Sequence, residues 1–356
     1  MQYLYICSFT ILIVASIIEI RGGRVSNSVK RVALFLLALL LAAVVFATRD
    51  AMDHTVYESI YNRLIIKMPE EWAIDAFPEY GYQWVNYISG NVLGFDFNAF
   101  RGFYAFISLL MLFYFSKYLT NKTFMFTMLY YPKYYMTGLI THIRSSFIYP
   151  FIFVFIQLIE KKRYISFFTL TVFLSQFHMS ALLFNFLPVL ILLRSRAAYA
   201  LLTIPLAIIC YFLIAQPLAE IFSTLGFRQA DYFNSNIADD RTFFGIEMLK
   251  RFCICLLIYY LYRYNKIITT KEDLVCKIVL AGIFIYYVFF DARFISDRVP
   301  AIFSFIEPLV FIYLYEKSDS KLNKKIALAI VLAYALLDFY TRMLLSSAFP
   351  NHISLF

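Results

Sequence analysis

The sequence predicts an all-α, polytopic membrane protein with about twelve transmembrane helices. Of its 356 residues, 62% are hydrophobic and only 15% are charged, whereas about a quarter of the residues of a soluble domain are charged. The apolar residues form continuous runs rather than alternating patterns. Continuous runs favour helices over a β-barrel, since in lipid every backbone group must be paired internally. We expect a single transmembrane domain over residues 1–356.

Twelve apolar segments have about the length that a membrane-crossing helix requires. They are 2–20, 32–48, 102–117, 123–139, 145–159, 164–177, 179–193, 198–216, 247–262, 274–291, 299–315 and 326–341. The first segment lacks a basic start and a cleavage site, so we interpret it as a retained helix rather than a signal peptide. Residues 164–193 form either two short crossing helices or a re-entrant hairpin.

The orientation in the membrane follows from the distribution of lysine and arginine in the short loops. Nineteen of the 32 basic residues lie in one set of loops: Arg21, Arg24, Lys30, Arg31, Lys117, Lys122, Lys161, Lys162, Arg163, Arg194, Arg196, Arg263, Lys266, Lys271, Lys277, Lys317, Lys321, Lys324 and Lys325. We expect that side to be cytoplasmic. Both termini and the two long loops, 49–101 and 217–246, then face outward.

The first long loop contains two further helical patterns. Between His54 and Lys67, apolar residues recur at Val56, Tyr57, Ile60, Tyr61, Leu64 and Ile65. Between Tyr80 and Val92 they recur at Tyr80, Trp84, Tyr87 and Ile88. Each pattern places one apolar stripe on a helix, which is typical of helices that lie along the bilayer surface or cap a cavity.

Several classes of site are not indicated. The five cysteines lie in apolar segments without the spacing of zinc ligands. The histidines form no H-x-x-H or H-x-x-x-H pair, and the phosphate-binding glycine motifs are missing from the sequence. The net charge of +9 is explained by membrane topology rather than by nucleic acid. We therefore expect no metal, no nucleotide cofactor and no nucleic-acid partner.

Charged residues at the outward helix ends are the first candidates for function, because ionisable groups near the membrane are costly. Arginine binds phosphate through two parallel hydrogen bonds, and several arginines converging on an outward cavity would hold a pyrophosphate. We favour Arg144, Arg293 and Arg298. The alternative is that each pairs with a carboxylate, for instance Arg293 with Asp291 or Asp297. The outward set comprises Arg49, Asp50, Asp53, Glu79, Arg101, Lys133, His142, Arg144, His178, Arg228, Arg241, Arg293, Asp297 and Arg298.

His178 lies at the outward end of an apolar segment. Histidine titrates near neutrality and can accept a proton from a hydroxyl. The alternative is a structural histidine at a helix end. Asp53 and Glu79 are candidates for the same general base, or for ordering a sugar hydroxyl, and their alternative is a solvated loop acid.

Five short motifs follow one another along the chain: Arg49-Asp50-x-x-Asp53-x-x-x-Tyr57, Glu79-Tyr80-Gly81-Tyr82, Ile143-Arg144-Ser145, Phe177-His178-x-Ser180-Ala181-Leu182 and Asp297-Arg298. Their order and spacing extend over residues 45 to 300. With these motifs the chain resembles the EpsG-like branch of the Wzy-type polysaccharide polymerases. The sequence departs from the family pattern at Ser145 and at His54.

The resemblance implies a glycosyltransferase of the bacterial plasma (inner) membrane whose active site faces the periplasm or exterior. Such an enzyme takes a sugar chain from undecaprenyl diphosphate and joins it to a new lipid-linked repeat unit. It implies a fold similar to the multi-spanning lipid-dependent glycosyltransferases (GT-C-like, O-antigen ligase-like). A chain-length regulator, a flippase and membrane lipid are further expected partners.

The roles follow as a hypothesis. Arg144, Arg293 and Arg298 hold the donor diphosphate, and His178, Asp53 or Glu79 is the catalytic base. Arg49 and Arg101 are further substrate-binding candidates. The alternatives in function are a flippase for the same lipid-linked sugar, an O-antigen ligase with the same donor, and a membrane acyltransferase. The sequence shows no duplicated halves, which a transporter usually has.

Overall fold

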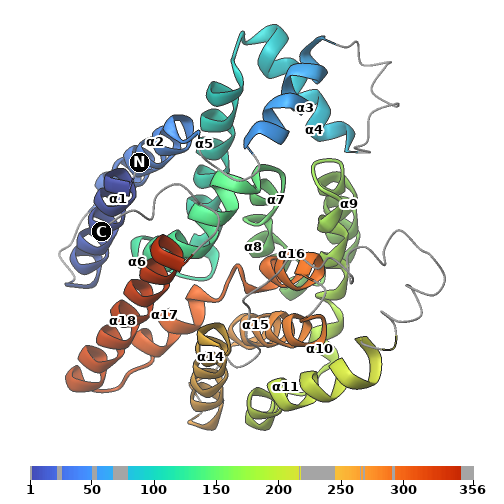
Figure 1. Ribbon diagram of the computed structural model, residues 1–356. Coiled ribbons are helices and arrows are strands. Elements are labelled where there is room, and N and C mark those ends of the chain that lie inside the picture. Colours follow the sequence, from blue (N-terminus) through green and yellow to red (C-terminus); the bar gives the residue numbers. More distant parts are fainter. Residues whose placement is uncertain are drawn as a thin grey trace. The chain divides into compact units, whose positions relative to one another are not determined.

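The computed structural model describes residues 2–21, 26–49, 54–66, 79–215, 217, 245–264, 266–267, 269–290 and 293–345. Within these ranges all regular secondary structure is helical, which confirms the predicted all-α class there (Figure 1). The chain divides into two compact units, which are Met1–Asn185 with Leu328–Phe356, and Phe186–Ala327. The prediction of one transmembrane domain stays a prediction.

The first unit is built mainly from nine α-helices of the N-terminal half. They are α1 (Gln2–Arg21), α2 (Asn27–Ala47), α3 (His54–Ile66), α4 (Tyr80–Tyr87), α5 (Phe97–Phe115), α6 (Thr123–Tyr130), α7 (Ile143–Ile148), α8 (Phe151–Glu160) and α9 (Tyr164–Ser175). A π-helical segment, Tyr131–Leu139, continues α6, and a 3-10 helix, Met179–Phe186, follows α9.

The described part of the second unit contains six further α-helices. They are α10 (Val189–Leu192), α11 (Ala197–Cys210), α14 (Ile246–Arg263), α15 (Thr270–Val288), α16 (Arg293–Ser304) and α17 (Pro308–Glu316). The last helix, α18 (Lys321–Leu345), begins in this unit and continues into the first.

Every one of the twelve predicted segments coincides with a described helix or with two consecutive helices. Seven of the described stretches are long and apolar enough to cross a membrane. They are Gln2–Arg21, Asn27–Ala47, Phe97–Tyr118, Ile143–Glu160, Ala197–Ile214, Arg298–Glu316 and Lys321–Met343. The chain is therefore a multi-pass membrane protein, and the count of twelve crossings stays a prediction.

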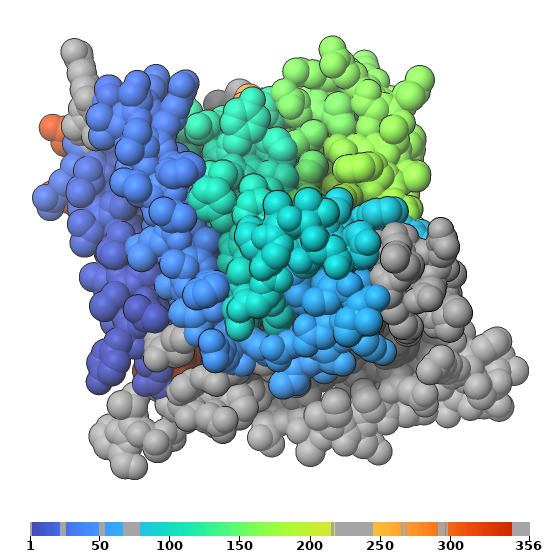
Figure 2. Space-filling view, turned by 90° about the horizontal axis from the view of Figure 1, so that it is seen from above, coloured from blue at the N-terminus to red at the C-terminus, as the bar shows by residue number. Residues whose placement is uncertain are grey.

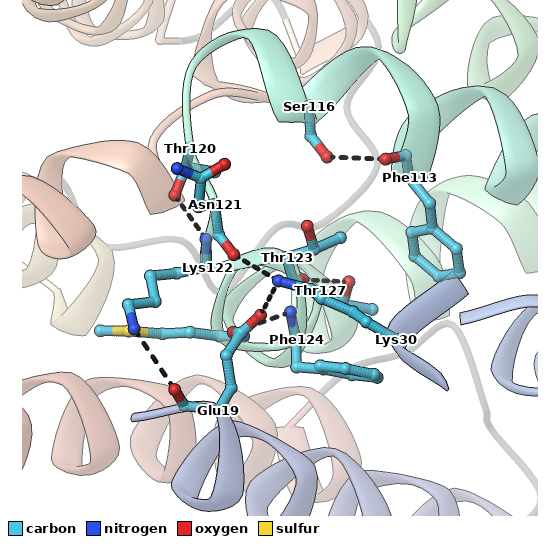
Figure 3. Close-up of polar contacts among 11 residues, drawn as sticks. Glu19, Lys30, Phe113, Ser116, Thr120, Asn121, Lys122, Thr123, Phe124 and Thr127 are labelled. Atoms are coloured by element: carbon cyan, nitrogen blue, oxygen red, sulfur yellow. Dashed lines mark hydrogen bonds and ion pairs between the residues drawn. The ribbon is translucent and has the colours of Figure 1, made fainter. Parts of the chain in front are cut away.

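A buried carboxylate joins the ends of three helices in the first unit (Figure 3). Glu19 at the end of α1 accepts a hydrogen bond of 2.6 Å from Nζ of Lys30 in α2. Its second oxygen accepts from the backbone N–H groups of Phe124 and Met125, at 3.1 and 3.2 Å. Glu19 thus satisfies two N–H groups at the start of α6 that have no partner within their own helix.

The π-helical segment after α6 places two tyrosines against the N-terminal helices. Pro132 has no N–H to donate, which loosens the α-helical ladder at that point. The hydroxyl of Tyr131 lies 2.5 Å from Oγ of Ser8 in α1. The hydroxyl of Tyr135 donates to the carbonyl of Leu41 in α2 at 2.7 Å. These bonds fix the segment that leads to α7.

Both helices predicted in the first long loop are present. Along α3, Tyr57, Ile60, Tyr61 and Leu64 are buried in a cluster with Phe97 and Phe100 of α5. In the space-filling view the blue atoms of α3 lie against the cyan atoms of the residues that follow (Figure 2).

Three of the four residues of the apolar stripe predicted over Tyr80–Ile88 are exposed, and the fourth, Tyr87, packs partly buried against the cluster of α3 and α5. Tyr80, Trp84 and Ile88 are 50%, 47% and 43% exposed. The opposite face, which carries Gln83 and Asn86, is buried. The helix therefore turns polar side chains toward the protein.

Ion pairs fix the helix ends of the second unit. Lys277 in α15 pairs with Asp273 at 2.7 Å and donates to the carbonyl of Leu193 at 2.6 Å. Glu272 pairs with Lys317 at the end of α17, at 2.8 Å. Glu272 also completes a capping box with Thr269 at the start of α15, which satisfies orphan backbone groups there.

Candidate functional site

Three of the predicted site residues meet in the first unit. One carboxylate oxygen of Glu79, Oε2, accepts a hydrogen bond from Nη1 of Arg144. The other oxygen, Oε1, lies 3.0 Å from Nδ1 of His178 and accepts from the backbone N–H of Met179, also at 3.0 Å. Segments 65 and 99 residues away from Glu79 thus converge on one carboxylate.

Glu79 reaches this position because of the way α4 begins. It occupies the position before the first helical residue, yet its side chain does not cap its own helix. Instead the backbone N–H of Tyr82 donates to the carbonyl of Gln176 at 3.1 Å. A β-carbon on Gly81 would lie 3.0 Å from that carbonyl oxygen, so any larger residue would require the two segments to move apart. The contact brings the start of α4 against the turn that carries His178.

Arg144 is the second residue of α7. Its guanidinium lies 5.6 Å from the ring centroid of Tyr57 in α3 and 5.8 Å from that of Tyr82 in α4. These rings attract the cation and shield it from water. The side chains of Glu79, Arg144 and His178 are 4%, 11% and 18% exposed, so the imidazole is the most accessible of the three.

The protonation states follow from the contacts. Burial opposes ionisation of Glu79, but the hydrogen bond with His178, the charge of Arg144 and the N–H of Met179 outweigh it, so the pKa of Glu79 lies below its ordinary value. The carboxylate is ionised and can only accept hydrogen bonds, so Nδ1 of His178 must donate. In the neutral imidazole, Nε2 then carries a lone pair that can accept a proton.

Arg101 has a different environment. It is fully buried in α5. Its Nη1 donates to the carbonyl of Thr48 at the end of α2, at 2.6 Å, and its Nη2 donates to the carbonyl of Ile140 at 2.9 Å. The guanidinium therefore joins two chain segments beside α5, and its substrate-binding role stays a prediction.

The other predicted residues are not brought to this cluster by the described structure. Arg49 is exposed just after α2, and Asp53 lies outside the described residues. Arg293 and Arg298 belong to α16 of the second unit, and the side chain of Arg293 lies outside the description. A pocket that combines Arg144 with these two arginines stays a prediction.

Two residues of the cluster were missing from the predicted site. Tyr57 and Tyr82 face the guanidinium of Arg144. Both stand in the motifs Arg49-Asp50-x-x-Asp53-x-x-x-Tyr57 and Glu79-Tyr80-Gly81-Tyr82, which was the signal that could have identified them. Within the described part of the chain, histidine, cysteine, aspartate and glutamate form no group of three that could hold a metal ion.

A model of the EpsG family matches residues 31–353, nearly the whole chain. None of the curated proteins and none of the solved structures compared with the chain matches it.

Proposed function

The chain belongs to the EpsG family, a family of Wzy-like polymerases, and from this premise we propose that it polymerises lipid-linked oligosaccharide repeat units. The donor is a glycan on undecaprenyl diphosphate, and the acceptor is a second lipid-linked repeat unit. The reaction takes place on the extracytoplasmic face of a bacterial plasma membrane. The arrangement of Glu79, Arg144 and His178 is the observation that supports this reaction most directly.

His178 is the catalytic base in this proposal. Its Nδ1 is held by Glu79, so Nε2 is the nitrogen that faces the acceptor hydroxyl. General bases act best when their pKa lies near the working pH, which suits an imidazole. The carboxylate of Glu79 accepts hydrogen bonds from Arg144, His178 and the backbone N–H of Met179, and it stays ionised. Glu79 therefore positions His178 rather than accepting the proton itself.

The transfer step forms one bond, breaks one bond and moves one proton to His178. The acceptor hydroxyl oxygen attacks the anomeric carbon of the donor sugar and forms the new glycosidic bond. Its proton passes to Nε2 of His178. The bond between the anomeric carbon and the diphosphate oxygen breaks, and its electron pair leaves with the diphosphate.

Negative charge develops on the leaving diphosphate, and nearby cations would stabilise it. A guanidinium has five N–H donors. In Arg144 one of them donates to Glu79, and the side chain also has a hydrogen bond with Tyr57. We assign the diphosphate to Arg144 together with Arg293 and Arg298, and the acceptor sugar to Arg49 and Asp53. Arginines fixed in advance around the leaving group would stabilise the transition state electrostatically.

Polymerisation by the purified protein tests the proposal. The protein is placed in liposomes with one synthetic lipid-linked repeat unit, and products are separated by size. A ladder of products spaced by one repeat unit is expected, and the His178→Ala protein should make none. Transfer to a different acceptor only would identify a ligase instead. Movement of the lipid across the bilayer without any new glycosidic bond would identify a flippase.

A further inference from the structure

A second buried cation lies in α14, outside the site described above. Arg251 is 7% exposed. Its guanidinium carbon lies 3.6 Å from the ring centroid of Tyr286 in α15. Two of its nitrogens, Nε and Nη1, are buried and meet no hydrogen-bond acceptor among the described residues.

Such an arrangement is costly for a structural residue. A buried donor without an acceptor is destabilising, and more so when it is charged. In Arg101 of the first unit both terminal nitrogens donate to backbone carbonyls, while Nε meets no acceptor among the described residues. In Arg251 a terminal nitrogen, Nη1, is unsatisfied as well. The ring of Tyr286 attracts the cation of Arg251 but accepts no in-plane hydrogen bond from Nε or Nη1. The unsatisfied Nε and Nη1 therefore indicate an acceptor outside the described residues, which a bound ligand would supply.

The charges around Arg251 are balanced. Lys250 is also buried and pairs with Glu247 at 3.2 Å. Glu247 and Glu307 both interact electrostatically with the guanidinium. Two cations thus stand beside two carboxylates, so an incoming anion would be attracted by Arg251 and opposed by the nearby glutamates. The charge of Glu247 should weaken the binding of an anion.

Helix α14 coincides with the predicted transmembrane segment 247–262. Arg251 lies five residues after the first residue of the helix, which is about 7.5 Å along its axis. If segment 247–262 crosses the membrane as predicted, Arg251 lies near one end of the crossing, close to the level of the headgroups. The phosphate groups of membrane lipids lie at that level, and their paired oxygens match the guanidinium fork.

We propose that Arg251 binds the phosphate group of a membrane lipid, through Nε and Nη1, with the guanidinium held against Tyr286. The lipid is either the polyprenyl diphosphate carrier or an ordinary anionic phospholipid, which share this chemistry. The proposal does not depend on the polymerase reaction, because it concerns binding alone.

Binding is measured on the purified full chain by native mass spectrometry in detergent. The probes are farnesyl diphosphate, phosphatidylglycerol, inorganic pyrophosphate and farnesol. Arg251→Lys and Arg251→Gln should each weaken the binding of the phosphate probes at least about 10-fold, which corresponds to the loss of one charge-assisted hydrogen bond. Arg263→Gln is the matched control, because Arg263 is exposed at the far end of the same helix, and it should bind as the wild type does.

The four probes separate the sources of the ligand. Preference for farnesyl diphosphate over phosphatidylglycerol identifies the carrier, and equal binding identifies phospholipids in general. Farnesol should not bind in an Arg251-dependent way, because it lacks phosphate. Unchanged binding of every phosphate probe in both Arg251 variants would overturn the proposal. It would also be overturned if these variants weakened the binding of farnesol as much as that of the phosphate probes.

Glu247→Gln provides a test that does not require changing Arg251. Removing this carboxylate should tighten binding of the phosphate probes, since it removes repulsion and releases Lys250. If Arg251 and Lys250 serve only in structural ion pairs, the same change destabilises the protein and leaves lipid binding unchanged. Unchanged or weaker binding to the Glu247→Gln protein would therefore count against the site even where the Arg251 variants do not fold.

Discussion

Nδ1 of His178 lies 3.0 Å from Oε1 of Glu79, across 99 residues of sequence. The contact gives the imidazole a fixed orientation, because the carboxylate also holds the N–H of Met179 and the guanidinium of Arg144. Glu79 and His178, which the sequence offered as alternative bases, thus have different roles in the proposed reaction: Glu79 positions the imidazole of His178, and the imidazole accepts the proton.

His178→Ala should abolish polymer in cells while the protein still reaches the membrane. Loss of a general base typically lowers a rate by about 100- to 10,000-fold. Polymer length on gels and the amount of protein in membranes are measured together. His54→Gln is the control, because His54 contacts Asn98 at 3.1 Å and its replacement can keep that bond. Long polymer made by the His178→Ala protein would exclude the catalytic role of His178.

Glu79→Gln should destabilise the protein, because it leaves the buried cation of Arg144 without its partner. Breaking one side of a buried pair costs about 3–5 kcal/mol. The double variant Glu79→Gln with Arg144→Gln should regain much of that stability. Thermal unfolding in detergent gives the four corners of the cycle. Additive effects of the two changes would show that the pair has no energetic coupling.

Arg144→Lys should fold and insert but make no long polymer. A lysine can keep one bond to Glu79, yet it lacks the fork that binds a diphosphate. Polymer length in cells is compared with that of Arg63→Lys, because Arg63 is an exposed arginine of α3. Full-length polymer from the Arg144→Lys protein would mean that a single positive charge suffices at this position.

The stability of the protein should fall in acid through Glu79. The pKa of its carboxyl group in the folded protein lies below the ordinary value of 4.5, so the unfolded chain takes up the proton first as pH decreases. The stabilisation is complete above about pH 4.5 and is lost as pH falls through the lower folded pKa. Midpoints of thermal unfolding between pH 6 and pH 3.5 should decrease less steeply for Glu79→Gln. Parallel curves for the two proteins would contradict the lowered pKa.

Gly81→Ala should separate α4 from the turn that carries His178. Its new methyl group would lie 3.0 Å from the carbonyl oxygen of Gln176, and such overpacking costs about 1–3 kcal/mol. Both thermal stability and polymer yield should decrease. Gly138→Ala is the matched control, because the nearest atom to its methyl group would be Cε2 of Tyr149, at 4.0 Å. Equal effects of the two changes would show that the close approach at Gly81 is not required.

The periodicity and composition of the sequence were sufficient to predict where the helices lie. Each of the twelve apolar segments and both loop patterns coincides with helix in the described part of the chain, because hydrophobic period and helix length are local properties of the chain. Motif resemblance also selected Glu79, Arg144 and His178 as candidates. It could not show that they share one carboxylate, since the three residues come from segments far apart in the sequence.

The direction of α4 shows what the sequence by itself cannot determine. Its apolar residues Tyr80, Trp84 and Ile88 are exposed, while Gln83 and Asn86 are buried. In a membrane protein, lipid and protein core are both apolar, so a stripe of apolar residues does not say which of them it faces. The sequence could not determine either which groups the arginine side chains contact. Only packing decided that Arg101 binds two carbonyls, that Arg144 binds Glu79, and that Arg251 stacks on Tyr286.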